Sequence, residues 1–391
     1  MRIVQVSLLT VASAMAFSQS APPAQPVWQI QDSGTSVSLR GIYSVDGLVA
    51  WASGTRGTVL KTIDGGANWQ KCTVPDVEGD GVMLDFRGVQ AWDAQTAIVM
   101  ASGPGAKSRL YKTTDGGINW DLLITNSDQD GFWDAIHMTS RETGVLIGDA
   151  VKGAFELQHH SIQRRAPSFP LFVTQNGGTS WRRIDEGNLY AKVDDSGNPA
   201  ESIFAASNSA VLNIGSNDET LFITGGIISS LHHVHYPKGL VPLLCKGPCA
   251  FESTTDSTLA IGGSAGGFSL AANLDNPASP VVVAVGGDFS RPDATAGSAA
   301  TCLINIDATI GRDKCQASAM PPHGYRSSVQ WSEPLKAFVA AGPNGSDISR
   351  DDGKTWQPLD NGNWNALSLP FVVGPNGRIA HLNPAALPAG K

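Results

Sequence analysis

Short apolar segments separated by glycine, asparagine and aspartate recur along this chain, and little of it repeats with helical periodicity. Residues 211–214, 220–224 and 281–285 are typical, because β-branched and aromatic side chains dominate them. The pattern predicts an all-β fold of short strands joined by tight turns.

One turn sequence, Ser/Thr-x-Asp-x-Gly-x-Ser/Thr/Asn-Trp, occurs at residues 62–69, 113–120, 174–181 and 349–356, with asparagine in place of aspartate in the third copy. Each copy predicts a hairpin tip in which the hydroxyl residue ends a strand, the aspartate accepts turn N–H groups and glycine takes a positive φ. The tryptophan begins the next strand and packs beneath the turn. We therefore expect structural roles for Asp64, Trp69, Asp115, Trp120, Asn176, Trp181, Asp351 and Trp356.

The spacing of the four copies predicts the number of repeats. Successive copies lie about 50–60 residues apart, and the gap before the fourth is about three times as long, which leaves room for two repeats without the motif. A last partial repeat from Trp364 lacks an outer strand that residues 27–30 can supply. We predict one domain over residues 27–391, a seven-bladed β-propeller of four-stranded antiparallel blades closed by strands from both termini, with six or eight blades as alternatives.

The repeat resembles the Asp-box, or BNR repeat, of sialidase-like propellers, and residues 27–391 resemble the BNR-like family related to the photosystem II assembly and stability factor. The resemblance is carried by residues 51–62, 85–87, 286–288, 324–326 and 342–347. It implies a non-enzymatic helper that binds a protein partner through an arginine-lined face, matched here by Arg40, Arg87 and Arg326. Asn176, the two repeats without the motif and the histidine-rich residues 231–235 depart from the family pattern.

The predicted innermost strands begin with an apolar or aromatic residue followed by a polar one: Arg40, Arg87, Asp134, Arg326 and Asn365. Because the innermost strands of a propeller surround its central channel, these side chains are expected to converge on one mouth. Guanidinium groups gathered there would bind a carboxylate or phosphate. The expected ligand is therefore a protein partner or another anion. The alternative is that the arginines pair with neighbouring groups and hold the channel polar without a ligand.

A sialidase-like glycoside hydrolase acting on anionic or other glycans is the competing function, because such enzymes share this propeller. The candidates would be Tyr325 as nucleophile and Asp134 as acid. The chain has only five tyrosines and no Arg-Ile-Pro motif before the first blade. We therefore assign no catalytic residue. The glycine-rich residues 262–267 lack the strand-to-helix context of a nucleotide-binding site, so no cofactor is predicted.

The formal net charge of −8 argues against nucleic acid or an anionic membrane as partner through bulk electrostatics. His159 and His160, and His232, His233 and His235, are too few ligands for a metal centre, and a solvated loop is the expected setting of the second group. The insertion at residues 158–170, with Arg164 and Arg165, is expected to be a surface loop. We expect a monomer.

Residues 1–20 read as a secretory signal peptide and residues 21–26 as a flexible leader, with no membrane segment after cleavage. The expected location is periplasmic or extracellular. In such an oxidising compartment, Cys245 with Cys249 and Cys302 with Cys315 are plausible local disulfides, which leaves Cys72 unpaired.

Overall fold

The computed structural model describes residues 25–75, 84–152, 155–158, 161–164, 166–184, 189–214, 219–235, 251–276, 280–306 and 313–388. The predicted signal peptide lies outside the described residues, as does all but the end of the leader. The same holds for Cys245, Cys249, His159, His160 and Arg165.

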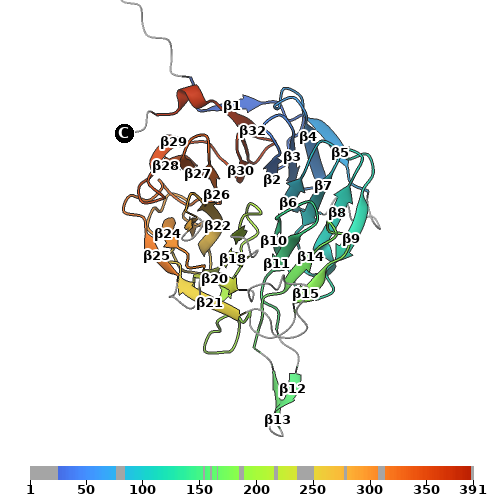
Figure 1. Cartoon of the computed structure of the whole chain (residues 1–391), viewed down its shortest axis with the longest axis vertical. Helices are drawn as coiled ribbons and strands as arrows, with labels where there is room; N and C mark the ends of the chain where they lie inside the picture. Colours follow the sequence, from blue (N-terminus) through green and yellow to red (C-terminus); the bar gives the residue numbers. More distant parts are fainter. Residues whose placement is uncertain are drawn as a thin grey trace, which may run out of the picture.

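Seven antiparallel sheets stand around a central axis like the blades of a propeller (Figure 1). From the inside outwards, blade 1 contains β2 (Leu39–Ser44), β3 (Ala50–Gly54), β4 (Thr58–Thr62) and β5 (Gln70–Thr73). Blade 2 contains β6 (Phe86–Ala91), β7 (Ala97–Ala101), β8 (Arg109–Thr113) and β9 (Asp121–Thr125). Blade 3 contains β10 (Trp133–Met138), β11 (Gly144–Gly148), β14 (Leu171–Thr174) and β15 (Arg182–Ile184).

Blade 4 contains β17 (Val211–Ile214), β18 (Glu219–Ile223), β20 (Ser230–His235) and β21 (Phe251–Asp256). Blade 5 contains β22 (Ala265–Asn273), β23 (Val281–Asp288), β24 (Ala299–Leu303) and β25 (Lys314–Ala317), and the short strands β16 (Glu201–Ser202) and β19 (Gly225–Gly226) extend its sheet. Blade 6 contains β26 (Ser328–Ser332), β27 (Ala337–Gly342), β28 (Gly345–Ser349) and β29 (Gln357–Asp360). The only helices in the described ranges are two short 3-10 turns, η2 (Gly105–Lys107) and η3 (Pro384–Ala386).

Blade 7 closes the ring with strands from both ends of the chain. It contains β30 (Ala366–Ser368), β31 (Phe371–Val373) and β32 (Ile379–Leu382), and the N-terminal strand β1 (Trp28–Gln31) pairs with β32 as its outermost strand. Each innermost strand contacts the next around the ring, from β2 through β30 and back to β2. The predicted all-β fold of seven four-stranded blades is confirmed.

The core lies between the blades, because each sheet packs both of its faces against neighbouring sheets. The second strand of each blade is therefore almost completely buried: all five residues of β7 are buried. Ile98 and Met100 of blade 2 pack against Trp133 and Leu146 of blade 3 in one such layer. This packing explains why short apolar runs dominate the sequence pattern.

The four repeated turns share one hydrogen-bond pattern. In the first, the Thr62 hydroxyl accepts the N–H of Gly66 at 2.9 Å and donates to Asp64 at 2.8 Å, and Asp64 accepts the N–H of Asn68 at 2.9 Å. The other three turns repeat these bonds, with Asn176 taking the place of the aspartate in the third. Lys61 also reaches from blade 1 to the second turn and donates to the carbonyl of Gly116 at 2.7 Å.

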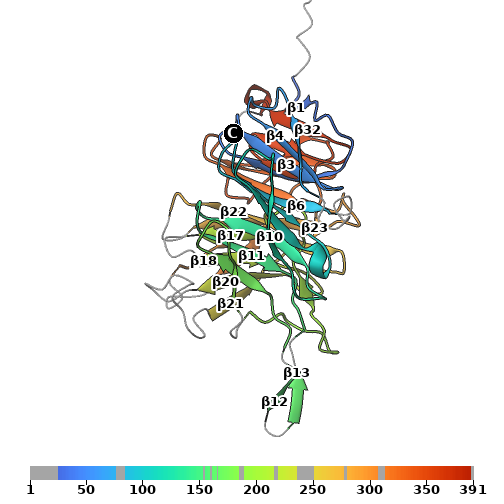
Figure 2. The same cartoon turned by 90° about the vertical axis from the view of Figure 1, so that its right-hand side faces the viewer.

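Blade 5 lacks a repeated turn and carries a disulfide instead. Cys302 of β24 and Cys315 of β25 are directly opposite each other and are bonded. Cys72 is a buried free thiol. The insertion in blade 3 forms a hairpin of β12 (Phe155–Gln158) and β13 (Ser161–Arg164), which projects away from the ring (Figure 2).

Candidate functional site: the arginine mouth of the central channel

Four innermost strands carry a β-bulge at the same position. The pairing register shifts between Leu39 and Gly41 in blade 1, and the equivalent shifts fall at Arg87, Asp134 and Phe268 in blades 2, 3 and 5. A bulge adds one residue to a strand and re-aims its side chain. The bulged residues are therefore Arg40, Arg87, Asp134 and Phe268, and with Asp85 they define what we call the arginine mouth.

Arg87 and Arg40 lie close to each other but differ in their partners. Arg87 donates from Nε to Asp85 at 2.8 Å and from Nη1 to the carbonyl of Ala205 at 3.1 Å. The buried Nε of Arg40 has no hydrogen-bond partner among the described residues. Burial lowers the pKa of Arg40, and the positive charge of Arg87 lowers it further, while Asp85 only partly opposes them. An incoming anion would relieve both effects, because it would pair with Arg40 and screen the repulsion.

Asp134 does not supply the missing negative charge. Burial raises its pKa well above the usual range and the neighbouring carboxyl of Asp149 adds to the shift, while Arg87 and backbone N–H groups only partly oppose them. Burial also raises the pKa of Asp149 to about 6. One oxygen of Asp134, Oδ2, has no hydrogen-bond partner in the described part of the chain. Because burial disfavours the charged form of Asp134 and Asp85 is paired to Arg87, neither carboxyl group fully balances the positive charge of Arg40.

An aromatic cluster borders Arg40. The rings of Phe204 and Phe268 stack with their centroids 4.3 Å apart, and Phe268 also meets the ring of Tyr325 at 4.8 Å. Phe289 packs edge-on against both phenylalanines and is 50% exposed. The mouth therefore offers a cationic part and an apolar part side by side.

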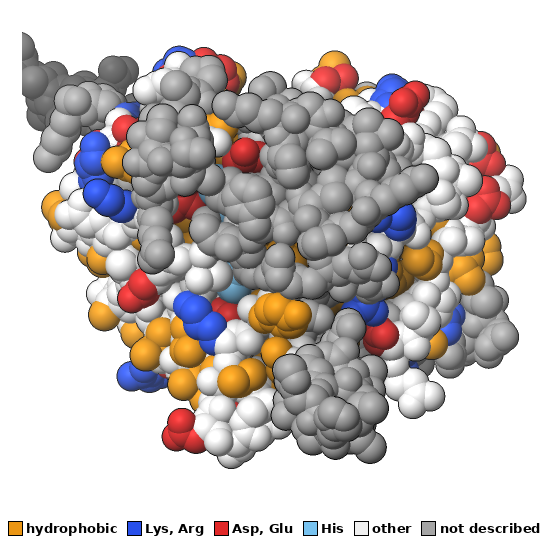
Figure 3. Space-filling model, turned by 60° about the horizontal axis from the view of Figure 1, so that its bottom comes forward, with side chains coloured by type: hydrophobic (Ala, Val, Ile, Leu, Met, Phe, Trp, Pro, Cys, Tyr) orange, Lys and Arg blue, Asp and Glu red, His pale blue; other side chains and the backbone are white. Residues whose placement is uncertain are grey.

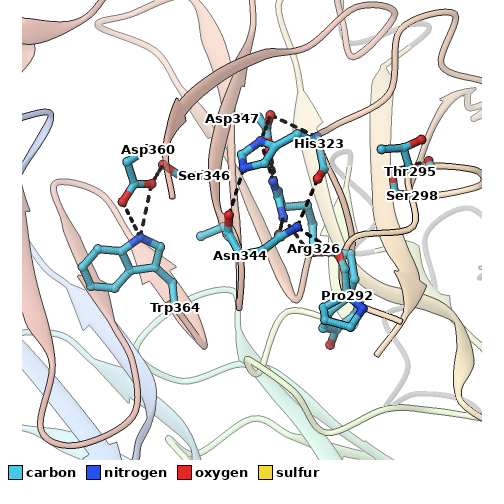
Figure 4. Close-up of polar contacts among 12 residues, drawn as sticks. Pro292, Thr295, Ser298, His323, Arg326, Asn344, Ser346, Asp347, Asp360 and Trp364 are labelled. Carbon is cyan, nitrogen blue, oxygen red and sulfur yellow. Dashed lines mark hydrogen bonds and ion pairs between the residues drawn. The ribbon is translucent and has the colours of Figure 1, made fainter. Parts of the chain in front are cut away.

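Arg326 is not part of this mouth, contrary to the expected convergence. Its side chain is fully buried in blade 6, where Nε donates to Asp347 at 2.5 Å and Nη1 donates to the Tyr325 carbonyl at 2.7 Å (Figure 4). Further contacts to Asn344 and His323 complete the network. The physical reason is the strand: β26 begins two residues later and pairs with β27 without a bulge, so Arg326 is not re-aimed toward the channel.

Asn365 also has a structural partner rather than an open position. Its side-chain N–H group donates to the Leu39 carbonyl at 2.7 Å, and its own carbonyl accepts the Ser327 hydroxyl at 2.7 Å. These bonds join blades 6, 7 and 1 near the closure of the ring. The five predicted residues thus separate into Arg40, Arg87 and Asp134 at the mouth and Arg326 and Asn365 in the framework.

Residues 203–210 cross the channel and form the green loop at the centre of Figure 1. We call them the channel segment. Its backbone carbonyl at Ala205 accepts from Arg87 in blade 2, and Ser207 donates to the carbonyl of Ser327 in blade 6 at 2.6 Å. Asn208 accepts the N–H of Ile136 in blade 3 at 2.9 Å. The segment therefore separates the two ends of the channel.

Tyr325 does not have the properties that the nucleophile of a hydrolase mechanism would require. Burial raises the pKa of Tyr325 above its usual range, and the charge of Arg40 only partly opposes it. A tyrosine nucleophile needs a lowered pKa or an adjacent base. No glutamate contact to Tyr325 is present among the described residues.

His232 and His233 are buried in strand β20 and do not lie in a solvated loop. His232 is 3.1 Å from Glu201, and His233 lies between Glu219 at 2.6 Å and Asp313 at 2.9 Å. Burial alone would lower the pKa of His233, but the hydrogen bonds of Asp313 and Glu219 raise it. The two carboxylates therefore offset the effect of burial on the His233 imidazole. The sequence pattern alone does not reveal that this histidine is buried. No cluster of ligands suited to a metal ion occurs in the ranges described above.

Acidic and basic side chains are interspersed over the side of the molecule shown in Figure 3. Within the ranges that the structure describes, no helix has the length and apolar character of a membrane span.

No protein-family model matches the chain. Over 166 residues, 40% of its length, it is 26% identical to the photosystem II stability/assembly factor HCF136, chloroplastic, of Arabidopsis thaliana. Over 141 residues it is 23% identical to the protein of the same name from Oryza sativa subsp. japonica. The chain is homologous to these assembly factors over the aligned part. The alignments cover 34% and 28% of the two relatives' own lengths.

Solved structures show the same fold around the whole ring. YCF48 from Cyanidioschyzon merolae matches 92% of this chain with a TM-score of 0.59 at 18% identity, and the alignment covers 99% of that protein. YCF48 bound to D1 peptide matches 93% of this chain with a TM-score of 0.55 at 14% identity, and the alignment covers all of that protein. The WD40 propeller domain of Doa1 reaches a TM-score of 0.53 at 11% identity, over 93% of this chain and 99% of that domain. The likeness to these structures describes the architecture, so function has to be argued from the site.

Sequence reasoning missed three features of the site. Phe204 and Phe289 follow no repeat, because Phe204 belongs to the channel segment and Phe289 lies just after β23. Asp149, which raises the pKa of Asp134, follows β11. Phe204 lies seven residues before the inner strand β17, and Phe289 follows the second strand of its blade, so no repeated signal in the sequence marks either residue.

Proposed function

We propose that this chain is an exported, non-enzymatic propeller with Asp-box turns that acts as a binding scaffold or assembly factor, and that it holds a protein partner at the arginine mouth. The observation that carries the proposal is Arg40, whose buried Nε lacks a partner beside a second arginine. A carboxylate of the partner would bind the half-buried guanidinium of Arg40 and balance its charge. The homology to photosystem II assembly factors and the D1 peptide held by YCF48 support a protein partner.

The aromatic part of the mouth narrows the chemistry of the partner. Phe289 is half exposed and packs on Phe204 and Phe268, so an apolar side chain placed there would be removed from water. A peptide segment with a carboxylate next to an apolar side chain would satisfy both parts. We propose no hydrolase activity, because the raised pKa of Tyr325 disfavours its use as a nucleophile.

The test uses affinity capture from extracts of the source cells with three proteins: wild type, Arg40→Gln and Arg350→Gln. Both variants remove one positive charge, but Arg350 is exposed on blade 6. We expect wild type and Arg350→Gln to capture the same partner. Arg40→Gln should bind it at least about tenfold more weakly, as expected for a lost charge-assisted hydrogen bond. Equal unfolding midpoints show that the variants are folded.

Capture of the same partner with equal affinity by Arg40→Gln would refute the arginine mouth as the binding site. Glycosidase turnover that is lost in Tyr325→Phe would favour the hydrolase alternative. Export is tested separately, by fractionating cells that express the full chain and sequencing the mature N-terminus.

A further inference from the structure

The channel has a cavity at the end opposite the arginine mouth. It encloses about 320 Å³, and Tyr43, Gln90 and His137 line it. These residues follow Arg40, Arg87 and Asp134 by three positions on the same strands, which is about 10 Å at the usual strand rise. The channel segment lies between the two sites, and its residues Ser207, Asn208 and Ser209 belong to the lining of the cavity.

Three carboxamide side chains give this cavity its polarity. Gln90 accepts the N–H of Met138 at 3.2 Å, Asn208 that of Ile136 at 2.9 Å and Gln330 that of Leu369 at 2.6 Å. Because each partner is a backbone donor, the bonded atom must be the amide oxygen. None of the three NH₂ groups has a hydrogen-bond partner in the described parts of the chain, so the cavity is rich in unused donors.

Two of the three serine hydroxyls that line the cavity, those of Ser207 and Ser209, have no free proton to add. Ser207 donates to the Ser327 carbonyl at 2.6 Å, so Ser209 must donate to Ser207 at 2.7 Å and Ser269 to Ser209 at 2.6 Å. The amide groups of Gln90, Asn208 and Gln330 are therefore donors available to a ligand, together with the hydroxyl of Ser368, which accepts the N–H of Ser44 at 2.9 Å.

The cavity is electrically neutral. Its lining contains no aspartate, glutamate, lysine or arginine, and burial lowers the pKa of His137 to about 4, so the imidazole is uncharged at neutral pH. A carboxylate or phosphate would find no cation there, and a cation would find no carboxylate. A wholly apolar ligand would cover the three NH₂ groups without pairing them, which costs free energy.

Two half-buried aromatic side chains, Tyr43 and Trp331, complete the lining, together with apolar residues such as Leu212. Trp331 is held by its ring contact with Phe338 at 4.8 Å and by its N–H bond to Glu333 at 3.1 Å. The apolar faces of such rings suit the C–H faces of a sugar, while amide N–H groups suit its oxygens. The volume is at the small end for ligand pockets, which limits the ligand to about one ring.

We propose that this cavity, which we call the amide pocket, binds the terminal ring of a neutral carbohydrate. The channel segment closes the inner end, so the pocket accepts a chain end or a free sugar rather than the interior of a polymer. The proposal does not depend on the arginine mouth, because the two sites share no ligand-contacting side chain.

The experiment measures binding of methyl glycosides of glucose, galactose and N-acetylglucosamine to the full chain by saturation-transfer NMR and calorimetry. Methyl glucuronide and inorganic phosphate serve as charged probes. We expect at least one neutral sugar to bind with a dissociation constant of about 10 mM or tighter. Binding should weaken at least about tenfold in Trp331→Ala, because a ring contact is lost, and in Gln330→Met, because a hydrogen bond is lost.

The matched control is Trp92→Ala, which removes a similarly half-buried tryptophan that does not line the pocket. It should bind the sugar as wild type does. No saturable binding of any neutral sugar would overturn the proposal, and so would equal affinity in Trp331→Ala and Gln330→Met. Loss of sugar binding in Arg40→Gln would also overturn it, because the sugar would then occupy the arginine mouth.

Discussion

Replacing Arg326 with methionine should strongly destabilise the propeller. Arg326 and Asp347 are both fully buried and 2.5 Å apart, and the guanidinium also bonds the Tyr325 carbonyl and Asn344. Methionine fills much of the same volume but leaves the Asp347 carboxylate without its cation. Removing one member of a buried ion pair typically costs about 3–5 kcal/mol. That is a large share of the roughly 5–15 kcal/mol by which domains are stable.

The assay is guanidinium unfolding followed by tryptophan fluorescence, because tryptophans occur in the cores of several blades. The matched control is Arg141→Met. Arg141 forms an ion pair with Asp93 at 2.8 Å, but its side chain is 62% exposed. An exposed pair contributes at most about 1 kcal/mol, so the midpoint of the control should barely move.

A second variant separates the loss of the pair from the loss of packing. Arg326→Met combined with Asp347→Leu removes both charges, so it should recover part of the stability lost in the single variant. The reasoning is refuted if Arg326→Met costs no more than Arg141→Met. A folded and fully stable Arg326→Met that has lost its partner would instead return Arg326 to the binding site.

Three further predictions follow from the framework. The pKa of His233 in the folded protein is raised above 6.5. The stabilisation that the charged imidazole provides is therefore present below that pH and is lost as the pH rises through the folded-state pKa. The unfolding midpoint should fall with rising pH in wild type, and it should fall less in His233→Gln. Replacing Cys302 and Cys315 by alanine should cost about 3 kcal/mol, and reducing agent should lower the midpoint of wild type but not of the variant. Lys61→Met should cost about 1–2 kcal/mol, since it removes the bond to the Gly116 carbonyl, and calorimetric melting of the variant measures the loss.

Most of the fold could be predicted because its information is local. The Thr62 turn needs only a hydroxyl, an acceptor and glycines at fixed offsets, and all its bonds are made within a few residues. The spacing of this turn gives the blade count even though three of the seven blades lack a copy. The outer position of β1 could be predicted for a related reason, since one blade had too few strands.

The site could be predicted only in part, because it depends on contacts between distant residues. Arg40 and Arg326 look alike in sequence, but a bulge is present in blade 1 and absent in blade 6. A bulge is a property of how two strands pair, and one strand alone does not specify it. The buried setting of His233 depends on Asp313, which is supplied by another blade.

The channel segment gives a physical reason for two separate sites in one channel. An open channel would let water and ions equalise the environments of its two ends, whereas residues 203–210 cross it and bond blades 2, 3 and 6. One end can then hold unbalanced positive charge at Arg40 while the other stays neutral and donor-rich. Because the two ends differ in the sign and number of charges, an acidic peptide and a neutral sugar would not compete. Simultaneous binding of both, each with its affinity unchanged by the other, is the outcome that this separation requires.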